Sequence, residues 1–249
     1  MMKKYVLSLL LLAALLLAAT GCGAAPAPEA PAGSYSGKIV QITDTTLLLA
    51  SDESDTDLCT VGLAELTLTD EADTAISATD LACGMSVAVT YDGSISESYP
   101  AQLSGASALT ILQRESDLVG LYRTVIDDLY AVDPGLNHQV SLLAFDLDGL
   151  QNLTRAEKSA LLYLTGSALG LETMTATYDS LAEDGYLDAD GRFTDGLLFT
   201  ITDTPIKGSR FTFDAQKWRS GLGAYYFLEC IAREKDGLWS YTIGNEAIS

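Results

Sequence analysis

The residues best suited to binding chemistry lie in one stretch of the C-terminal third, from Lys217 to Tyr226. Lys217 and Arg219 flank Trp218, and two glycines follow that let a ligand approach the backbone. Two cations beside an indole ring suit an anionic or sugar-like group. The predicted ligand contacts are Lys217, Trp218, Arg219, Tyr225 and Arg233. The alternative is a connection between strands, in which the glycines serve turn or bulge geometry, Trp218 packs and the cations are solvated.

Candidates for catalysis are weaker. A hydrolase needs a nucleophile with its base, or two carboxylates in one cleft. Asp146 and Asp148 form the most plausible carboxylate pair, and they support the alternative prediction of a carboxylate-dependent cell-wall hydrolase. The single histidine, His138, follows a Pro-Gly turn, and no G-x-S-x-G motif occurs, so we interpret it as a surface residue. We predict no catalytic residue and no cofactor.

Metal ligands and disulfides have little support. Acidic runs at 52–57 and 183–195 could offer oxygen ligands to calcium, but neither follows an Asp-x-Asp-x-Asp-Gly loop, and both are interpreted as solvated surface. The cysteines after residue 22 are Cys59, Cys83 and Cys230. Either Cys59 and Cys83 pair within one domain or all three are buried free thiols. The spacings fit neither zinc nor an iron–sulfur cluster, so no metal site is predicted.

The amino terminus carries the strongest signal. Two lysines precede an apolar run at 5–19, which is too short to span a bilayer and suits the core of a signal peptide. The following Thr20-Gly21-Cys22 resembles the lipobox of bacterial lipoproteins, with Ala19 where that motif prefers leucine. This resemblance implies cleavage after residue 21 and lipidation of Cys22. An ordinary secretory signal without lipidation is the alternative.

Residues 22–33 are rich in proline and alanine and should form a semi-extended tether after the lipidated cysteine. The predicted location is therefore the extracytoplasmic face of the cell membrane, with the membrane bound through the N-terminal lipid. The mature chain holds 34 acidic and 12 basic residues, a net charge of −22. Because nucleic-acid binding depends on Lys and Arg at phosphates, a nucleic-acid partner is excluded. A cell-wall component or another envelope protein remains as the predicted partner.

Composition changes abruptly near Gln113, which predicts a boundary between domains at 34–113 and 114–249. The first part contains neither Phe nor Trp and has one basic residue, Lys38. Its short apolar runs consist mainly of Thr, Val, Ile and Leu, and turn-forming residues separate one run from the next. The predicted strands cover 35–43, 46–50, 58–62, 65–69, 85–91 and 104–112. Six short strands of this kind favour a small antiparallel barrel.

A family resemblance appears in this first part. The segment Gly84 to Gly93, followed by Glu97-Ser98-Tyr99-Pro100-Ala101-Gln102, is similar to an uncharacterised domain of small Gram-positive lipoproteins, over about residues 35–112. The resemblance implies an OB-like barrel and an envelope location, and no activity. Residues 114–249 resemble no family that we identify.

The second part predicts an α+β domain with an antiparallel sheet. Helical periodicity and caps indicate helices at 118–132, 154–168 and 177–184. The predicted strands cover 139–145, 192–202, 209–214, 222–235 and 238–244. Asp236-Gly237 fixes the last hairpin, which places Lys235 opposite Leu238 and Cys230 opposite Ile243.

Alternation along this hairpin predicts two faces. The core face holds Tyr226, Leu228, Cys230, Ala232, Trp239, Tyr241 and Ile243. The mixed face holds Tyr225, Phe227, Glu229, Ile231, Arg233, Ser240 and Thr242. The mixed face either lines a ligand cleft or packs under the helices with a charged rim.

The fold class expected is multi-domain, a small all-β OB-like barrel followed by an α+β domain. The function expected is that of a membrane-anchored extracytoplasmic lipoprotein that binds a ligand or a partner of the cell envelope. Two alternatives stay open, the cell-wall hydrolase and a structural subunit of a membrane complex.

Overall fold

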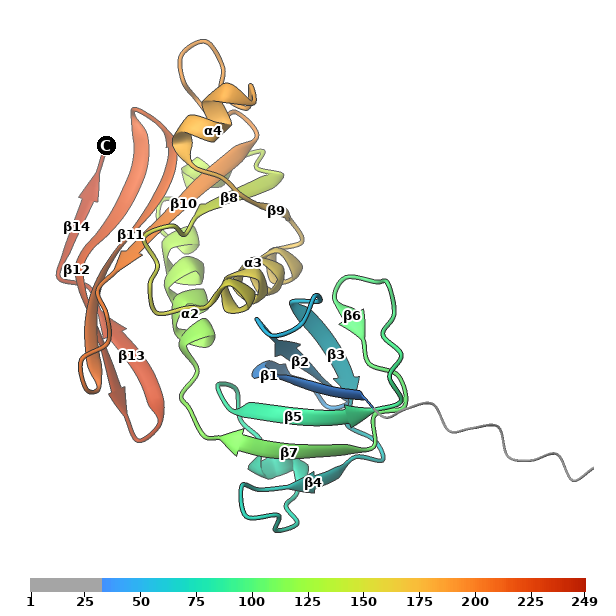
Figure 1. The fold of residues 1–249 in the computed structure, drawn as a ribbon. Helices are drawn as coiled ribbons and strands as arrows, with labels where there is room; N and C mark the ends of the chain where they lie inside the picture. Colours follow the sequence, from blue (N-terminus) through green and yellow to red (C-terminus); the bar gives the residue numbers. More distant parts are fainter. Residues whose placement is uncertain (1–32) are drawn as a thin grey trace, which may run out of the picture. The chain divides into compact units, whose positions relative to one another are not determined.

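The computed structural model describes residues 33–249, and Ala32–Ser249 forms one compact unit that contains two sheets (Figure 1). The predicted signal segment, Cys22 and nearly all of the predicted tether lie outside the described residues. None of the helices among residues 33–249 is long and apolar enough to cross a bilayer.

The first sheet has the strand order β4-β7-β5-β1-β2-β3-β6. Its strands are β1 (Gly33–Ile42), β2 (Thr46–Ala50), β3 (Leu58–Gly62), β4 (Thr67–Thr69), β5 (Ser86–Tyr91), β6 (Ala101–Gln102) and β7 (Ala108–Gln113). A short 3-10 helix, η1 (Ala78–Asp80), lies between β4 and β5. The sequence correctly predicts the inner strands and places the predicted boundary at the end of β7.

The predicted small antiparallel barrel is not confirmed, because the first sheet is not closed. The sheet is mixed, because β4 pairs with β7 and β6 pairs with β3 in parallel. Its edge strands span three and two residues and have no pairing with each other, so the sheet stays open. The sheet still has its own core, in which alternate residues such as Ile39, Leu49 and Val87 are fully buried.

The second sheet has the order β13-β12-β11-β10-β8-β9, and β14 also pairs with β12. Its strands are β8 (Leu142–Asp146), β9 (Glu172–Thr175), β10 (Gly196–Asp203), β11 (Arg210–Ser220), β12 (Gly223–Lys235), β13 (Leu238–Thr242) and β14 (Asn245–Ile248). The predicted antiparallel sheet is therefore wrong for part of its width, because β8 pairs in parallel with β10 and β9. A helix connects β8 to β9, and such a crossover returns the chain in the same direction.

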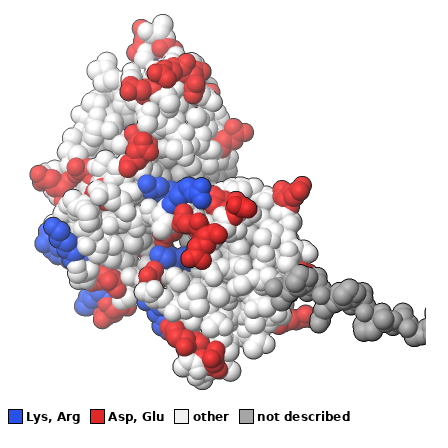
Figure 2. All heavy atoms as spheres, in the orientation of Figure 1, with Lys and Arg blue, Asp and Glu red and all other residues white. Residues whose placement is uncertain are grey.

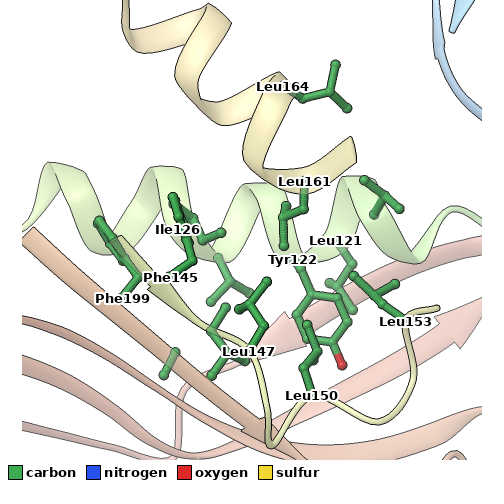
Figure 3. Packing of buried hydrophobic residues seen from close by; sticks show 14 of the residues in the cluster. Leu121, Tyr122, Ile126, Phe145, Leu147, Leu150, Leu153, Leu161, Leu164 and Phe199 are labelled. Carbon is green, nitrogen blue, oxygen red and sulfur yellow. The ribbon is translucent and has the colours of Figure 1, made fainter. Parts of the chain in front are cut away.

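Two helices cover the inner face of the second sheet. They are α2 (Leu118–Ala131) and α3 (Arg155–Leu169), both close to their predicted bounds. Periodic apolar residues of each helix pack on the sheet, and Figure 3 shows Tyr122 and Ile126 of α2 and Leu161 of α3 in this core. The same core includes Leu48 and Leu58 of the first sheet. The two sheets thus share one apolar core within one compact unit, and the multi-domain description is not confirmed.

The outer face of the second sheet is only partly covered. The short helix α4 (Tyr178–Glu183) packs there over a small cluster that includes Ala144, Leu198 and Phe193. No helix of residues 33–249 lies on the rest of that face, over β11 and β12 (Figure 1).

A buried carboxylate fixes the loop that leads into α3. Asp203, at the end of β10, accepts hydrogen bonds from the Tyr122 hydroxyl at 2.5 Å and from the Gln151 amide nitrogen at 2.7 Å. The backbone and side-chain nitrogens of Asn152 bind it too. The pKa of Tyr122 is raised, mainly by burial of the hydroxyl and to a lesser extent by its hydrogen bond to Asp203. This network holds α2, β10 and the loop together, and nothing in the sequence pattern pointed to it.

The last hairpin has the predicted register. Lys235 pairs with Leu238, and Ala232 with Tyr241, as the Asp236-Gly237 turn predicts. The predicted pair of Cys230 with Ile243 falls in the gap between β13 and β14, and the pairs on either side, Ile231 with Thr242 and Leu228 with Asn245, keep the predicted register.

The two faces predicted for the hairpin are wrong for the part of β12 that precedes a β-bulge at Glu229. Glu229 has a positive φ of 53°, and its amide donates to the Asp214 carboxylate at 2.6 Å. Leu228 and Glu229 of β12 therefore lie opposite the single residue Asp214 of β11, and the alternation of side chains along β12 shifts by one position. As a result Phe227 is buried in the core, whereas Leu228, predicted to lie in the core, is only half-buried.

Candidate functional site

Lys217 is fully buried and does not reach a ligand surface. Its ammonium group donates hydrogen bonds to the carbonyl oxygens of Tyr130 at 3.2 Å and of Val132, and to the Asn137 Oδ1 at 3.2 Å. These carbonyls lie at the C-terminal end of α2, where the last helical carbonyls have no partner within the helix. Burial lowers the pKa of Lys217 to about 8, so at neutral pH a cation still faces the negative end of the helix dipole. The side chain caps the helix.

Arg219 and Trp218 also have packing roles. The guanidinium group of Arg219 donates to the carbonyl oxygens of Leu136 at 2.6 Å, His138 at 2.7 Å and Thr194 at 2.5 Å. Trp218 lies on the opposite face of β11, as alternation requires, with its ring 5.1 Å from that of Tyr178. The three neighbours in sequence therefore face two different sides of the sheet.

The other two predicted contacts lie apart from this group. Tyr225 packs beside the core and donates to the Glu246 carboxylate, and this hydrogen bond raises its pKa. Arg233 lies near the far end of β12, exposed, opposite Arg210 of β11. The five predicted residues thus do not form one surface in this structure.

The remaining sequence candidates occupy turns and cores. Asp146 accepts a hydrogen bond from the Asp148 amide at 3.3 Å, which is a local turn contact. His138 is exposed just after the 3-10 helix η2 (Pro134–Asn137). The cysteines at 59, 83 and 230 are free thiols. Among residues 33–249, no group of three or more His, Cys, Asp or Glu side chains is placed to hold a metal ion.

The structure instead presents a groove along the free edge of β9. It has a volume of about 560 Å³. The residues that line it are Tyr99, Ser159, Leu162, Tyr163, Gly166, Ser167, Leu171, Glu172, Thr173, Met174 and Thr175. They come from α3, from the whole of β9 and from the loop before β6. Figure 1 shows where these elements lie.

The backbone of β9 is paired on one side only. The Glu172 amide donates to Ser141 and the Ala176 amide to Phe145, at 3.2 and 3.1 Å, both toward β8. In a parallel pair alternate residues point the other way, so the N–H groups of Thr173 and Thr175 face the groove. Within the described part of the chain neither N–H has a hydrogen-bond partner. The edge is a template to which another extended chain can pair.

Gly166 allows β9 to lie close to α3. A Cβ atom at this position would come within 2.8 Å of Thr173 Cγ2 and 2.9 Å of the Leu171 carbonyl oxygen. The amide of Leu171 in turn donates to the Gly166 carbonyl at 3.1 Å. Helix α3 and strand β9 therefore pack closely together and form two adjoining sides of the groove.

Two tyrosines supply the apolar contact surface at the other side. Tyr99 is 62% exposed, and its ring lies edge-on to that of Tyr163, with 6.2 Å between the centroids. Partial burial raises the pKa of Tyr99, so its hydroxyl stays protonated. A large aromatic side chain this exposed is available to pack on a ligand.

The groove is nearly neutral, whereas the protein around it is acidic. Glu172 is the one acidic or basic side chain among the described residues that line it. Figure 2 shows Asp and Glu spread over the face in view, with Lys and Arg at a few places. A ligand that carries positive charge is thus favoured at this site.

Comparison with known proteins covers mainly the first sheet. Residues 36–112 match the model of a family described as a protein of unknown function (DUF3221). No curated protein matches the chain. Among solved structures, the chain is similar to the yobA protein from Bacillus subtilis, with 18% identity, 34% of this chain and 100% of that chain covered, and a TM-score of 0.27. Tyr99 lies within the matched family segment, and α3 and β9 lie beyond it.

Sequence reasoning found one part of the groove and missed the other. Tyr99 belongs to the Glu-Ser-Tyr-Pro-Ala-Gln stretch that carried the family resemblance. The strand β9 was not predicted, although Thr173 and Thr175 alternate with Glu172 and Met174 as in a strand. That alternation, just after the glycine that ends α3, is the signal that could have found it.

Proposed function

We propose that the chain is a lipid-anchored protein of the extracytoplasmic membrane face that binds an extended segment of a partner polypeptide. The segment adds to β9 as a further strand and lies in the groove between this strand, α3 and Tyr99. The lipidation motif at Cys22 supports the anchor. The free edge of β9 supports the binding mode and is the observation that carries the proposal.

Strand addition fits the groove physically. The main chain of the added segment pairs with the outward groups of Thr173 and Thr175, and each hydrogen bond contributes about 1 kcal/mol net. Alternate side chains of the segment point toward α3, where Leu162 and Tyr163 are half-buried. Tyr99 closes over them from the other side. Main-chain pairing gives affinity, and the two tyrosines select an apolar or aromatic side chain.

Charge narrows the partner further. Glu172 stands at the start of β9, and the mature chain carries 34 acidic against 12 basic residues. The acidic protein attracts a segment that has Lys or Arg beside its apolar residue, whereas it repels an acidic segment. The occupant is therefore an extended, uncharged or basic stretch of an envelope protein. A subunit of a membrane complex is one protein that could supply it.

A matched pair of variants at Thr175 tests strand addition. Thr175→Pro removes the outward N–H but no ladder bond, because that N–H faces away from β8, and proline is tolerated on edge strands. Thr175→Val keeps the N–H. We expect peptides selected from a displayed library of short linear sequences to bind residues 32–249 and the valine variant alike, and the proline variant about tenfold or more weakly.

Thermal unfolding is the control, since Thr175 is exposed and both variants should keep the parent midpoint. A further variant, Tyr99→Ala, should weaken binding without loss of stability. Equal affinity of all the variants, or a library that yields no binding peptide, would refute the proposed function.

A further inference from the structure

The open outer face of the second sheet holds a second hollow, which is separated from β9 by β8 in the strand order. It has a volume of about 510 Å³ and lies over β10, β11 and β12. Its lining residues are Thr202, Asp203, Thr204, Arg210, Thr212, Phe213, Asp214, Glu229, Ile231 and Gly244. Polar side chains therefore replace the apolar ones expected where a sheet face is to be covered by another element.

Two arginines oppose each other at one end of this face. Arg210 of β11 and Arg233 of β12 are register partners, and both are exposed. Their neighbours Phe211 and Ala232 are buried, so the two guanidinium groups extend from the outer side. Like charges directly opposite each other on paired strands destabilise a sheet. The two arginines therefore lower the stability of the sheet unless an anion lies between their guanidinium groups.

Residues 33–249 form no ion pair that supplies that anion. Carboxylates are abundant, with 34 Asp and Glu in the chain, yet the ion pairs among residues 33–249 involve neither Arg210 nor Arg233. Two further exposed cations, Lys207 and Lys235, lie close by. The backbone of Lys207 forms an isolated β-bridge with that of Arg210, and Lys235 follows Arg233 by two positions on β12. Positive charge is thus concentrated at this end of an acidic molecule.

The opposite end of the hollow is acidic and held in place. The Glu229 carboxylate accepts a hydrogen bond from the Asn245 side chain at 2.6 Å, and Asp214 accepts one from the Glu229 amide at 2.6 Å. Thr212 lies between Arg210 and Asp214 along β11 with Thr204 beside it, and Thr202 is the register partner of Asp214. A bare anion would use only the arginine end. A ligand with a phosphate at one end and hydroxyl donors at the other satisfies both ends.

We infer that this face binds a phosphorylated polyol or sugar, with its phosphate between Arg210 and Arg233 and its hydroxyls toward Asp214 and Glu229. Arginine suits the phosphate because its planar donors bind two oxygens at once. The carboxylates accept the hydroxyl protons, and the threonines complete the contacts. This site is independent of the β9 groove and does not rest on its function.

Titration calorimetry on residues 32–249 tests the site with glycerol 3-phosphate, inorganic phosphate and glycerol as probes. We expect glycerol 3-phosphate to bind more tightly than inorganic phosphate, and glycerol not to bind. The double variant Arg210→Gln/Arg233→Gln should lower affinity about tenfold or more, because each lost bond to a charged group is a strong one. Arg192→Gln, at an exposed arginine elsewhere, should not.

Two outcomes separate this site from general effects. The double variant should unfold at the parent temperature or above it, because it relieves the repulsion between the arginines, so weaker binding cannot be assigned to unfolding. Asp214→Asn should weaken glycerol 3-phosphate and leave inorganic phosphate unchanged. Undiminished affinity in the double variant would overturn the site, and equal affinity for the two phosphates would overturn the polyol part of the inference.

Discussion

Replacing Cys22 with alanine should remove all fatty acid from the protein. In the predicted lipobox the sulfur of Cys22 is the atom that would receive the diacylglyceryl group, so the alanine variant has no acceptor for it. Each buried methylene contributes about 0.8 kcal/mol to membrane binding, and a protein with two acyl chains is stably held. The measurement is metabolic labelling with an alkyne fatty acid, followed by detergent phase separation.

Cys83→Ala is the matched control, because it removes a thiol from the folded unit and leaves the N-terminal motif intact. It should keep the full label and stay in the detergent phase. Mass analysis of the N-terminal peptide separates a cleaved, unlipidated chain from one that still holds residues 1–21. Label retained in the Cys22 variant would show that lipid is attached elsewhere and would remove the basis for the predicted anchor.

Lys217→Met should destabilise the folded unit by about 3 kcal/mol or more. The substitution keeps the length of the side chain but leaves the carbonyls of Tyr130 and Val132, and the Asn137 amide oxygen, without their buried donor. For a unit of this size the midpoint of thermal unfolding should fall by roughly 6–12 °C.

Lys235→Met supplies the comparison, since Lys235 is exposed at the end of β12 and its loss should change the midpoint little. The result also separates two interpretations of Lys217. If Lys217 contacted a ligand at the surface, the methionine variant would fold as well as the parent and lose only binding. A parent-like midpoint would therefore contradict the helix-capping role.

Local sequence signals predicted most of the elements, because their causes lie within a few residues. The capping box at Thr154 and Glu157 is formed as expected, with the Glu157 amide bound to Thr154 Oγ1 at 3.3 Å. The Asp236-Gly237 turn likewise fixed the register of its hairpin. The bulge at Glu229 was not predictable, since it depends on the pairing of β12 with β11 and reverses which face each side chain occupies.

The candidate site was harder to predict because its parts are distant in sequence. Lys217 reaches carbonyls 85 and 87 residues away, and an isolated Lys-Trp-Arg sequence gives no sign of that burial. The strand β9 has four residues between two helices, too few for a period to stand out. Even with both elements predicted, the approach of Tyr99 to Tyr163 requires the shared core that joins the two sheets.

Amide hydrogen exchange along β9 is the most direct test of the central claim. In the free protein the N–H groups of Thr173 and Thr175 face the groove and should exchange quickly, whereas those of Glu172 and Ala176, bonded to β8, should exchange slowly. Addition of a library-selected peptide to residues 32–249 should slow exchange at Thr173 and Thr175. Protection elsewhere on the protein, with these two amides still exchanging quickly, would contradict strand addition at β9.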